Sequence, residues 1–425
     1  MLVRPPRERE TASWALVGAW AVVIWLAVPY APVVRAWVEA SCGRIAFLYG
    51  TLALFAAAFV PLVAWMRARN APPSSVLVLV AVAAAYAWGA WQLRAIPEEA
   101  FHLLEYAILG VLAFRALVHR VHDPSIYLSA TAFGAIVGIV DEGLQWLVPE
   151  RYWTLGDIWI NVGAVALAQA GIAGALRPPI VRGPLAARSV RLFARFAAVA
   201  IVLLTLCLLN TPARIHWYAS RIPALDFLIT NESVMFEYGY LYRDVETGAF
   251  RSRLDPAALR ASDTSRGVEA GSILDAYPDA RYREFLRTYT PVSDPFVHEA
   301  RVHLYSRDKH LRLARDPTVG DEQGWHATVA WRENRILEKY FGQTLAASSR
   351  RLSAEDARYV ASTRVPWDRV PADERESWVS RTLVTEVGEG EIMAALAALL
   401  CLLFVLARVA AARERASVSE EARRA

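Results

Sequence analysis

The sequence predicts an all-α integral membrane protein with about eight transmembrane helices and a mostly helical extracytoplasmic domain between helices seven and eight. Of its 425 residues, 55% are hydrophobic and only 21% are charged. Mean hydropathy is +0.26. This composition excludes a disordered chain and disfavours an ordinary soluble enzyme. The charges are also unevenly spread, because residues 1–210 hold 16 basic and 11 acidic residues against 30 and 31 in the remainder. The first half is therefore apolar, and most of the second half resembles a soluble protein.

Eight apolar segments approach the roughly 20 residues that a helix needs to cross a bilayer core about 30 Å thick. They cover residues 12–34, 45–66, 75–95, 101–119, 125–148, 157–176, 191–209 and 391–409. Tryptophan and tyrosine residues near several ends are typical of the interfacial belts of membrane proteins. The first segment is too long for the core of a signal peptide, so we expect it to stay in place as the first span.

The arginines predict how these spans are oriented, because basic residues are enriched in cytoplasmic connections. If the N-terminus is cytoplasmic, 17 arginines fall on inside segments and only 4 in the short outside loops, namely Arg35, Arg44, Arg94 and Arg151. We therefore expect a multi-pass protein of the cell membrane with both termini in the cytoplasm. The expected domains are 1–95 (helices 1–3), 96–176 (helices 4–6), 177–210 (cytoplasmic loop and helix 7), 211–390 (extracytoplasmic domain) and 391–425 (helix 8 and cytoplasmic tail).

The segment between the seventh and eighth spans carries helix signals. Residues 217–242 could form strands or a segment that lies along the membrane. Capping patterns predict four helix starts, at Asp255, Asp294, Ser353 and Pro371. Residues 320–346 fit one long amphipathic helix.

The charged residues of that domain indicate no reaction. His298, Glu299, His303 and His310 are interpreted as surface or helix-packing residues. The histidine spacing there differs from that of a two-histidine zinc site. Arg332, Glu333 and Arg335 are interpreted as a solvated ion-pair face.

Polar side chains interrupt the fourth, fifth and sixth spans. Three pairs are each four residues apart and so share a helix face, namely His102 and Tyr106, Asp141 and Gln145, and Asp157 and Asn161. Glu142 adjoins Asp141, and Arg151 lies in the connection that follows. Because successive spans alternate in direction, we expect all of these groups to meet at the level of the extracytoplasmic leaflet.

Two adjacent carboxylates at that depth need a partner, because ionisable groups in the hydrocarbon region are costly. The partner could be a cation, His102, Arg151 or a metal. We expect Asp141 or Glu142 to act as a base or metal ligand and His102 as an acid or base. Arg151 could hold a phosphate or carboxylate.

Four further residues are ligand-binding candidates, namely Tyr106, Gln145, Asp157 and Asn161. The sequence assigns no metal, and a divalent cation stays open as a cofactor. A structural interpretation also stays open. In it, His102, Asp157 and Asn161 are ordinary polar residues at helix ends, and the Asp141–Glu142 pair only forms hydrogen bonds between helices.

The same residues carry a family resemblance over residues 85–176, roughly. The pattern is His102-x-x-x-Tyr106, Asp141-Glu142-x-x-Gln145, Pro149-Glu150-Arg151 and Asp157-x-x-x-Asn161-x-Gly163. It resembles the VanZ-like membrane family. The resemblance implies a small multi-span membrane protein of bacteria or archaea, one branch of which accompanies glycopeptide (teicoplanin) resistance, and it implies no particular reaction. The family often has a lysine three residues before the histidine, where this chain has Glu99.

Three functions are compatible with these observations. The first is an envelope protein whose outer-leaflet site acts on a phosphorylated lipid or cell-wall precursor, in a role like that in glycopeptide resistance. The second is a non-catalytic scaffold or partner subunit whose outer domain binds another envelope protein. The third is a transporter or proton relay. The lipid bilayer is the expected partner in each of the three. Nucleic acid is not an expected partner, because the soluble half has no basic patch with interleaved aromatic residues.

Overall fold

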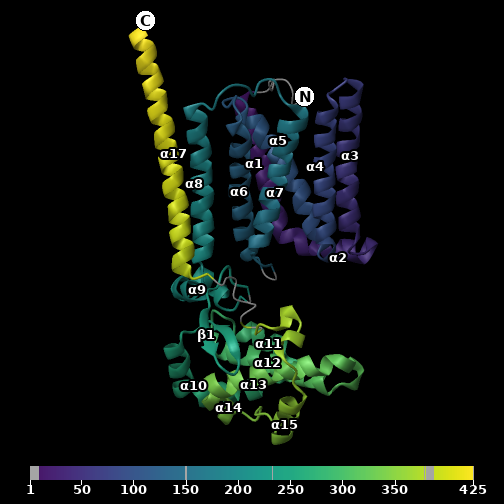
Figure 1. Cartoon of the computed structure of the whole chain (residues 1–425), viewed down its shortest axis with the longest axis vertical. Coiled ribbons are helices and arrows are strands. Elements are labelled where there is room, and N and C mark those ends of the chain that lie inside the picture. The colour runs from purple at the N-terminus through teal and green to yellow at the C-terminus, as the bar shows by residue number, and fades with distance from the viewer. Residues whose placement is uncertain (1–8, 149–150, 232, 378, 380–386, 425) are drawn as a thin grey trace. The chain divides into compact units, whose positions relative to one another are not determined.

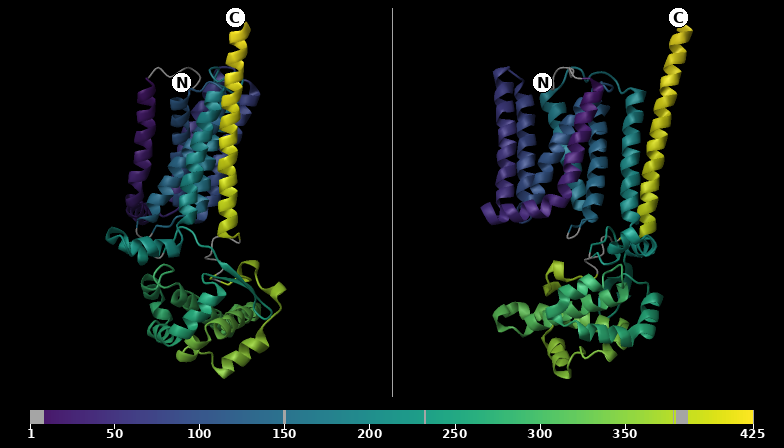
Figure 2. Two further views of the ribbon diagram at one scale, coloured as in Figure 1. Left: turned by 90° about the vertical axis from the view of Figure 1, so that its left-hand side faces the viewer. Right: turned by 180° about the vertical axis from the view of Figure 1, so that it is seen from behind.

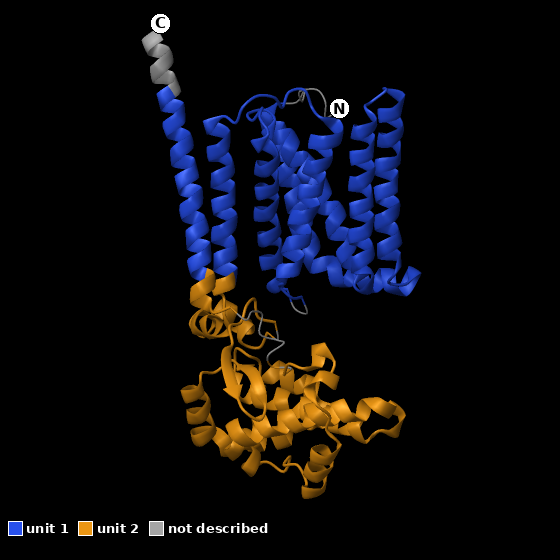
Figure 3. Cartoon of the chain, viewed as in Figure 1, with its two compact units in different colours: residues 1–207, 393–425 blue, residues 208–392 orange. Residues whose placement is uncertain are grey.

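The computed structural model describes residues 9–148, 151–231, 233–377, 379 and 387–424. The chain divides into two compact units (Figure 3). Unit 1 comprises Met1–Cys207 with Met393–Ala425, and unit 2 comprises Leu208–Ile392.

Helices dominate both units, which confirms the all-α class for the part of the chain that the structure describes. Within those residues, eight helices are long and apolar enough to cross a membrane, as the sequence predicts. They are Glu10–Cys42, Ala46–Ala68, Pro73–Ala95, Pro97–Leu117, Ser125–Trp146, Leu155–Leu176, Ala187–Leu209 and Glu389–Ala416. These helices indicate a multi-pass membrane protein.

Unit 1 is a helical bundle whose core is formed by its first six long helices. These are α1 (Glu10–Ala27), α3 (Ala46–Ala68), α4 (Pro73–Gln92), α5 (Ala100–Leu117), α6 (Ser125–Trp146) and α7 (Leu155–Gly171), which a π-helical turn extends over Ile172–Leu176. Buried polar atoms are paired across the bundle. The Tyr86 hydroxyl donates to the carbonyl of Ala164 at 2.5 Å, and Gln169 Nε2 donates to the carbonyl of Gly110 at 2.8 Å.

The first span ends earlier than the sequence predicts. Helix α1 stops at Ala27, a 3-10 turn covers Val28–Tyr30, and α2 (Ala31–Cys42) then runs across the end of the bundle (Figure 1, Figure 2). Pro29 and Pro32 lie at this elbow. A proline lacks the backbone N–H that an α-helix needs and clashes with the preceding turn, which explains the change of direction.

Glycines let α5, α6 and α7 approach closely. A Cβ added at Gly134 of α6 would lie 2.5 Å from Cγ2 of Val165 on α7. At Gly138, one turn further along α6, an added Cβ would lie 3.1 Å from the Cβ of Asn161. A Cβ at Gly134 would therefore require Val165 or its helix to shift, whereas at Gly138 the neighbouring atoms would have to move by a few tenths of an ångström.

Two further helices complete unit 1, α8 (Ala187–Leu209) and α17 (Glu389–Arg424). They are linked by an ion pair of 2.6 Å between Arg191 and Glu414. The start of α1 and the far end of α17 lie at the same end of this bundle, as an even number of spans requires (Figure 1). That the termini are cytoplasmic and residues 211–390 extracytoplasmic stays a prediction.

Unit 2 is a cluster of helices beside one short hairpin. Its helices are α9 (Pro212–Ala219), α10 (Pro256–Ala276), α11 (Tyr282–Thr288), α12 (Pro295–Arg315), α13 (Gln323–Tyr340), α14 (Gly342–Ala347) and α15 (Ala354–Thr363). Strands β1 (Tyr240–Asp244) and β2 (Gly248–Ser252) pair antiparallel. The segment 217–242 therefore includes the end of α9, the 3-10 segment Pro223–Ile229 and the first residues of β1. Phe250, Leu274 and Phe285 are among the residues of its core.

Three of the four predicted helix starts in unit 2 are confirmed. Asp255 Oδ1 accepts hydrogen bonds from the backbone N–H of Ala257 and Ala258, at 2.8 and 3.0 Å. Asp294 and Ser353 cap α12 and α15 in the same way. The fourth prediction, at Pro371, is wrong, because the described residues that follow it begin with the 3-10 turn Ala372–Glu374 in place of an α-helix.

The prediction of a single long helix over residues 320–346 is also wrong, because the helical segment is interrupted. It divides at Phe341, whose φ of −127° and ψ of 36° depart from helical geometry. The Phe341 ring is fully buried in the core of unit 2. Its packing therefore sets the division between α13 and α14, which a helical repeat in the sequence cannot reveal.

The interpretation of Arg332 and Glu333 as solvated is wrong, since they are 1% and 0% exposed. Glu333 Oε2 lies 2.6 Å from His303 Nδ1, and its other oxygen accepts a hydrogen bond of 2.6 Å from Arg332 Nη2. Arg332 also donates to the carbonyl of Arg375 at 2.5 Å. Only Arg335 matches the expectation, because it pairs at the surface with Glu246 and Glu338.

The histidines of α12 are packing residues rather than surface residues. His298, His303 and His310 are 7%, 0% and 1% exposed. Glu299, between the first two, is 0% exposed and accepts a hydrogen bond of 2.9 Å from the backbone N–H of Arg253.

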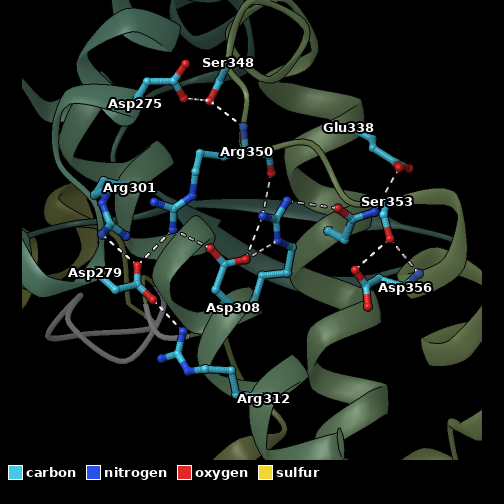
Figure 4. A network of polar contacts seen from close by, with 12 residues as sticks. Asp275, Asp279, Arg301, Asp308, Arg312, Glu338, Ser348, Arg350, Ser353 and Asp356 are labelled. Carbon is cyan, nitrogen blue, oxygen red and sulfur yellow. Dashed lines mark hydrogen bonds and ion pairs between the residues drawn. The ribbon is translucent and has the colours of Figure 1, made fainter.

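A second polar network joins α12 to the chain on either side of it (Figure 4). Asp279 accepts hydrogen bonds from Arg301, Arg312 and Arg350, at 3.0, 2.6 and 2.9 Å. Arg350 also donates to Asp308 at 2.7 Å. In this network Asp279 and Asp308 each have at least one guanidinium partner, whereas Asp275 accepts hydrogen bonds from Ser348 and Ser349.

Candidate functional site

The predicted site residues lie together at the end of unit 1 that α2 crosses. They come from three consecutive segments, with His102 and Tyr106 on α5, Asp141, Glu142 and Gln145 on α6, Arg151 in the connection, and Asp157 and Asn161 on α7. The close packing of α6 against α7 at Gly134 and Gly138 holds these segments together.

Gln145 links the acidic and basic members of the cluster. Its Nε2 donates to Oδ2 of Asp141 at 3.3 Å and to Oε1 of Glu142 at 2.8 Å. Its Oε1 accepts a hydrogen bond from Nη2 of Arg151. Tyr106 adds a second donor to Asp141, because its hydroxyl lies 3.2 Å from the same Oδ2. A single amide side chain therefore separates the guanidinium group from Asp141.

Glu142 connects this cluster to the start of α7. Its second oxygen, Oε2, accepts a hydrogen bond of 3.3 Å from the backbone N–H of Thr154. Thr154 in turn caps α7, since its Oγ1 accepts from the backbone N–H of Asp157 at 2.9 Å. Both oxygens of this fully buried carboxylate thus have partners within the protein.

A cavity of about 810 Å³ opens beside the cluster. Its polar side includes His102, Glu105, Asp141, Gln145, Arg151, Thr154 and Asp157. Its other side comes from α1, the elbow, α2 and α3 and is apolar apart from Arg35 and Arg44, with Ile24, Val28, Val34, Phe47 and Leu54 among the lining residues. The cavity therefore has one charged wall and one mainly apolar wall.

The structure separates the eight predicted site residues into two groups. Five line the cavity, namely His102, Asp141, Gln145, Arg151 and Asp157. Three are 0% exposed and lie behind the cavity wall, namely Tyr106, Glu142 and Asn161. The position of this second group fits a role in holding the first, whereas sequence spacing assigned all eight to one site.

Sequence reasoning missed several lining residues. Glu98 lines the cavity and is bound by Arg44, through contacts of 2.6 and 3.0 Å, with Arg35 at 3.7 Å. The sequence contains no signal for this pair, because its partners are 54 residues apart. Glu105 could have been found, since it lies three residues after His102 and faces it at 3.5 Å.

Several polar atoms of the site are buried without a hydrogen-bond partner among the described residues. They are Oδ1 of Asp141, Nε of Arg151 and Nδ1 of His102. Asp141 is only 1% exposed although it lines the cavity. Each of these three side chains has a contact through another atom or with Glu105, but a buried polar atom that makes no hydrogen bond is costly, so a ligand that supplied complementary groups would stabilise the site.

The described residues contain no group of three or more histidine, cysteine or acidic side chains arranged to hold a metal ion. The carboxylates of the site accordingly lie along the cavity wall rather than around one point. Pro149 and Glu150, which belong to the family-like pattern, lie outside the described residues.

Comparison of the chain with known protein families, with curated proteins and with solved structures found no match in any of the three.

Proposed function

We propose that this chain is a VanZ-like membrane protein of the cell envelope that binds a phosphorylated amphiphile in the cavity of unit 1. The ligand would be a lipid or a lipid-linked cell-wall precursor. One observation carries the proposal, namely a cavity of about 810 Å³ with charged residues on one wall and apolar residues on the other. An amphiphile is the class of molecule whose two ends match those two walls.

The energetics of the two walls support this class. Oδ1 of Asp141 and Nε of Arg151 have no hydrogen-bond partner within the described structure, and a polar headgroup could supply both. Ile24, Val28 and Phe47 offer apolar contacts to a hydrocarbon chain. Removing apolar surface from water contributes about 25 cal/mol per Å², so the chain would add affinity that the headgroup alone lacks.

Helix α2 supports entry from the membrane. It lies across the end of the bundle and contributes Val34 and Arg35 to the cavity. Trp37, on the same helix, is 68% exposed. A helix with exposed aromatic and basic residues at the end of a membrane bundle fits the bilayer interface, from which a lipid headgroup can reach the cavity.

Each lining residue has a role in this proposal. Arg151 would hold the phosphate, because a guanidinium group can bind phosphate oxygens through two N–H groups. Asp141 and His102 are the candidates for a base and an acid if the bound headgroup reacts. Glu142 is not a candidate base, because it lies behind the wall and both of its oxygens are bound.

A scaffold role is the second candidate function. It is favoured by the bonds from Tyr106, Gln145 and Thr154 to the two carboxylates, which join α5, α6 and α7. In this role the polar cluster would lock three helices together, and unit 2 would bind another envelope protein.

Filling the cavity tests the binding proposal. Gly50 of α3 lines the cavity, and a Cβ placed there meets nothing within 4 Å. Gly18 of α1 has equal space but does not line the cavity. In native mass spectrometry of the full chain purified in mild detergent, we expect wild type and Gly18→Leu to retain a bound amphiphile, and Gly50→Leu to lose it. A wild-type protein that carries no amphiphile would contradict the proposal.

A further inference from the structure

The charges that line the cavity are unbalanced. Among the described residues, five carboxylates line it, from Glu98, Glu99, Glu105, Asp141 and Asp157, against three guanidinium groups, from Arg35, Arg44 and Arg151. Glu98 already pairs with Arg44 and Arg35. In the described part of the lining, Arg151 is therefore the one arginine left for four carboxylates, of which Glu105 lies 3.5 Å from His102. A purely anionic headgroup would thus face a wall with an excess of negative formal charge.

We infer that the headgroup that binds here is zwitterionic, with an ammonium group close to its phosphate, as in an aminophospholipid. The inference rests on the proposed function and names the class of its ligand. Its geometric basis is that Arg151 and Asp141 lie on either side of Gln145, which contacts both. The two charges of one compact headgroup can therefore reach both residues at the same time.

Asp141 is the residue that selects for the ammonium group. It is 1% exposed and lines the cavity, and its Oδ1 has no hydrogen-bond partner among the described residues. Its other oxygen already accepts from Tyr106 and Gln145. A primary ammonium group offers three N–H donors and no acceptor, whereas an ionised phosphate offers acceptors only. Of these two groups, only the ammonium can donate a hydrogen bond to Oδ1 of Asp141.

Arg151 is the residue that holds the phosphate. Its Nη2 is engaged by Gln145, while its Nε is buried without a hydrogen-bond partner in the described structure. Hydrogen bonds between ionised partners are about twice as strong as neutral ones. The phosphate would thus bind on the Arg151 side of Gln145, and the ammonium group on the Asp141 side.

The test compares three short-chain lipids with identical tails on the full chain in detergent, with native mass spectrometry as the readout. Phosphatidylethanolamine carries phosphate and an ammonium group with N–H donors, phosphatidylcholine carries phosphate and a cation without N–H, and phosphatidylglycerol carries phosphate and neutral hydroxyl groups but no cation. We expect phosphatidylethanolamine to bind about tenfold or more tightly than phosphatidylglycerol, with phosphatidylcholine between them.

Two variants assign the preference to its residues. Asp141→Asn should remove most of the preference for phosphatidylethanolamine, and phosphatidylglycerol should bind at least as tightly as to wild type, because the wall loses a negative charge. Arg151→Gln should weaken all three lipids alike, because they share the phosphate. Glu39→Gln is the matched control, since Glu39 is an exposed carboxylate on α2 that does not line the cavity, and it should behave as wild type.

The outcomes separate this inference from the proposed function. Wild-type protein that binds phosphatidylglycerol as tightly as phosphatidylethanolamine would overturn the zwitterionic headgroup and leave an anionic amphiphile as the ligand. Wild-type protein that binds none of the three lipids, and carries no other amphiphile, would overturn both. The ranking of the three lipids on wild-type protein decides the matter even if a variant fails to fold.

Discussion

His303 and Glu333 of unit 2 lie fully buried, 2.6 Å apart, while Asp141 of unit 1 is almost equally buried and keeps one oxygen without a hydrogen-bond partner in the described structure. In unit 2 the charges lie at the contact between α12 and α13, where Arg332 also binds Glu333. In unit 1 they line a cavity. Nε2 of His303 also lacks a hydrogen-bond partner among the described residues, so neither burial of charge nor such an atom by itself indicates a functional site. The cavity beside Asp141 is what distinguishes the cluster of unit 1.

The protonation of the buried pair in unit 2 follows from its partners. Burial favours the neutral imidazole, but the carboxylates of Glu299 and Glu333 outweigh burial and raise the pKa of His303 to about 9. Burial likewise favours a neutral Glu333, but Arg332 and His303 outweigh it and lower the pKa of Glu333 to about 2. Both groups are thus charged near neutral pH.

The largest effect should come from breaking this pair. Glu333→Ala would leave Arg332 and His303 buried without their carboxylate, so we expect the free energy of unfolding of unit 2 to fall by about 3–5 kcal/mol. Urea denaturation of the full chain in detergent, followed by tryptophan fluorescence, measures the change. Glu338→Ala is the matched control, because Glu338 is on the same helix, 42% exposed, and pairs with Arg335. Its loss should cost less than about 1 kcal/mol. Equal costs for the two variants would contradict the comparison.

The second effect is a loss of stability at alkaline pH. The pKa of His303 is about 9 in the folded chain, above its ordinary value of 6.5. Its stabilising contribution is therefore complete below about pH 6.5 and disappears as the pH rises through about 9. The expected loss is on the order of 3 kcal/mol. It is measured as the difference between wild type and His303→Gln in urea denaturation from pH 6 to 10, roughly. A constant difference across that range would show that the imidazole is not charged.

The third effect concerns the packing that brings the unit 1 site together. Gly134→Ala should destabilise unit 1 by about 1–3 kcal/mol, because the new Cβ would lie 2.5 Å from the stiff side chain of Val165. Gly163→Ala on α7 is the control, since a Cβ there meets nothing within 4 Å, and it should be neutral or slightly stabilising. Denaturation of the full chain in detergent compares the two, and an unaffected Gly134→Ala variant would refute the close helix contact.

The smallest effect on stability should come from Asp141→Asn. The amide oxygen can still accept from Tyr106 and Gln145, and Oδ1 has no hydrogen bond to lose among the described residues, so we expect a change within about 1 kcal/mol. Glu142→Ala, which removes the acceptor for Gln145 and Thr154, should cost more. Unfolding in detergent measures both. If Asp141→Asn abolished folding, the scaffold function would gain support over ligand binding.

Much of this architecture could be predicted from local patterns. The eight spans follow from apolar runs, and the caps at Asp255, Asp294 and Ser353 follow from short-range side-chain chemistry. Helical spacing also identified His102 and Asp141 as candidates that the structure places on one cavity wall. In each case the responsible interactions lie within a few residues of one another along the chain.

The sequence by itself therefore determined that eight apolar helices form in the described chain and which polar residues interrupt them, since both depend on neighbours in the chain, although it placed the end of the first helix too late. Tertiary structure alone decided which of these groups face a cavity. Glu142 lies one residue from Asp141 yet is enclosed by Thr154, and Arg44 reaches Glu98 across 54 residues. The tertiary structure also decided that Arg332 and Glu333 are buried. Exposure and long-range pairing depend on which helices pack together, and a helical repeat cannot distinguish a face covered by another helix from one in contact with solvent or lipid.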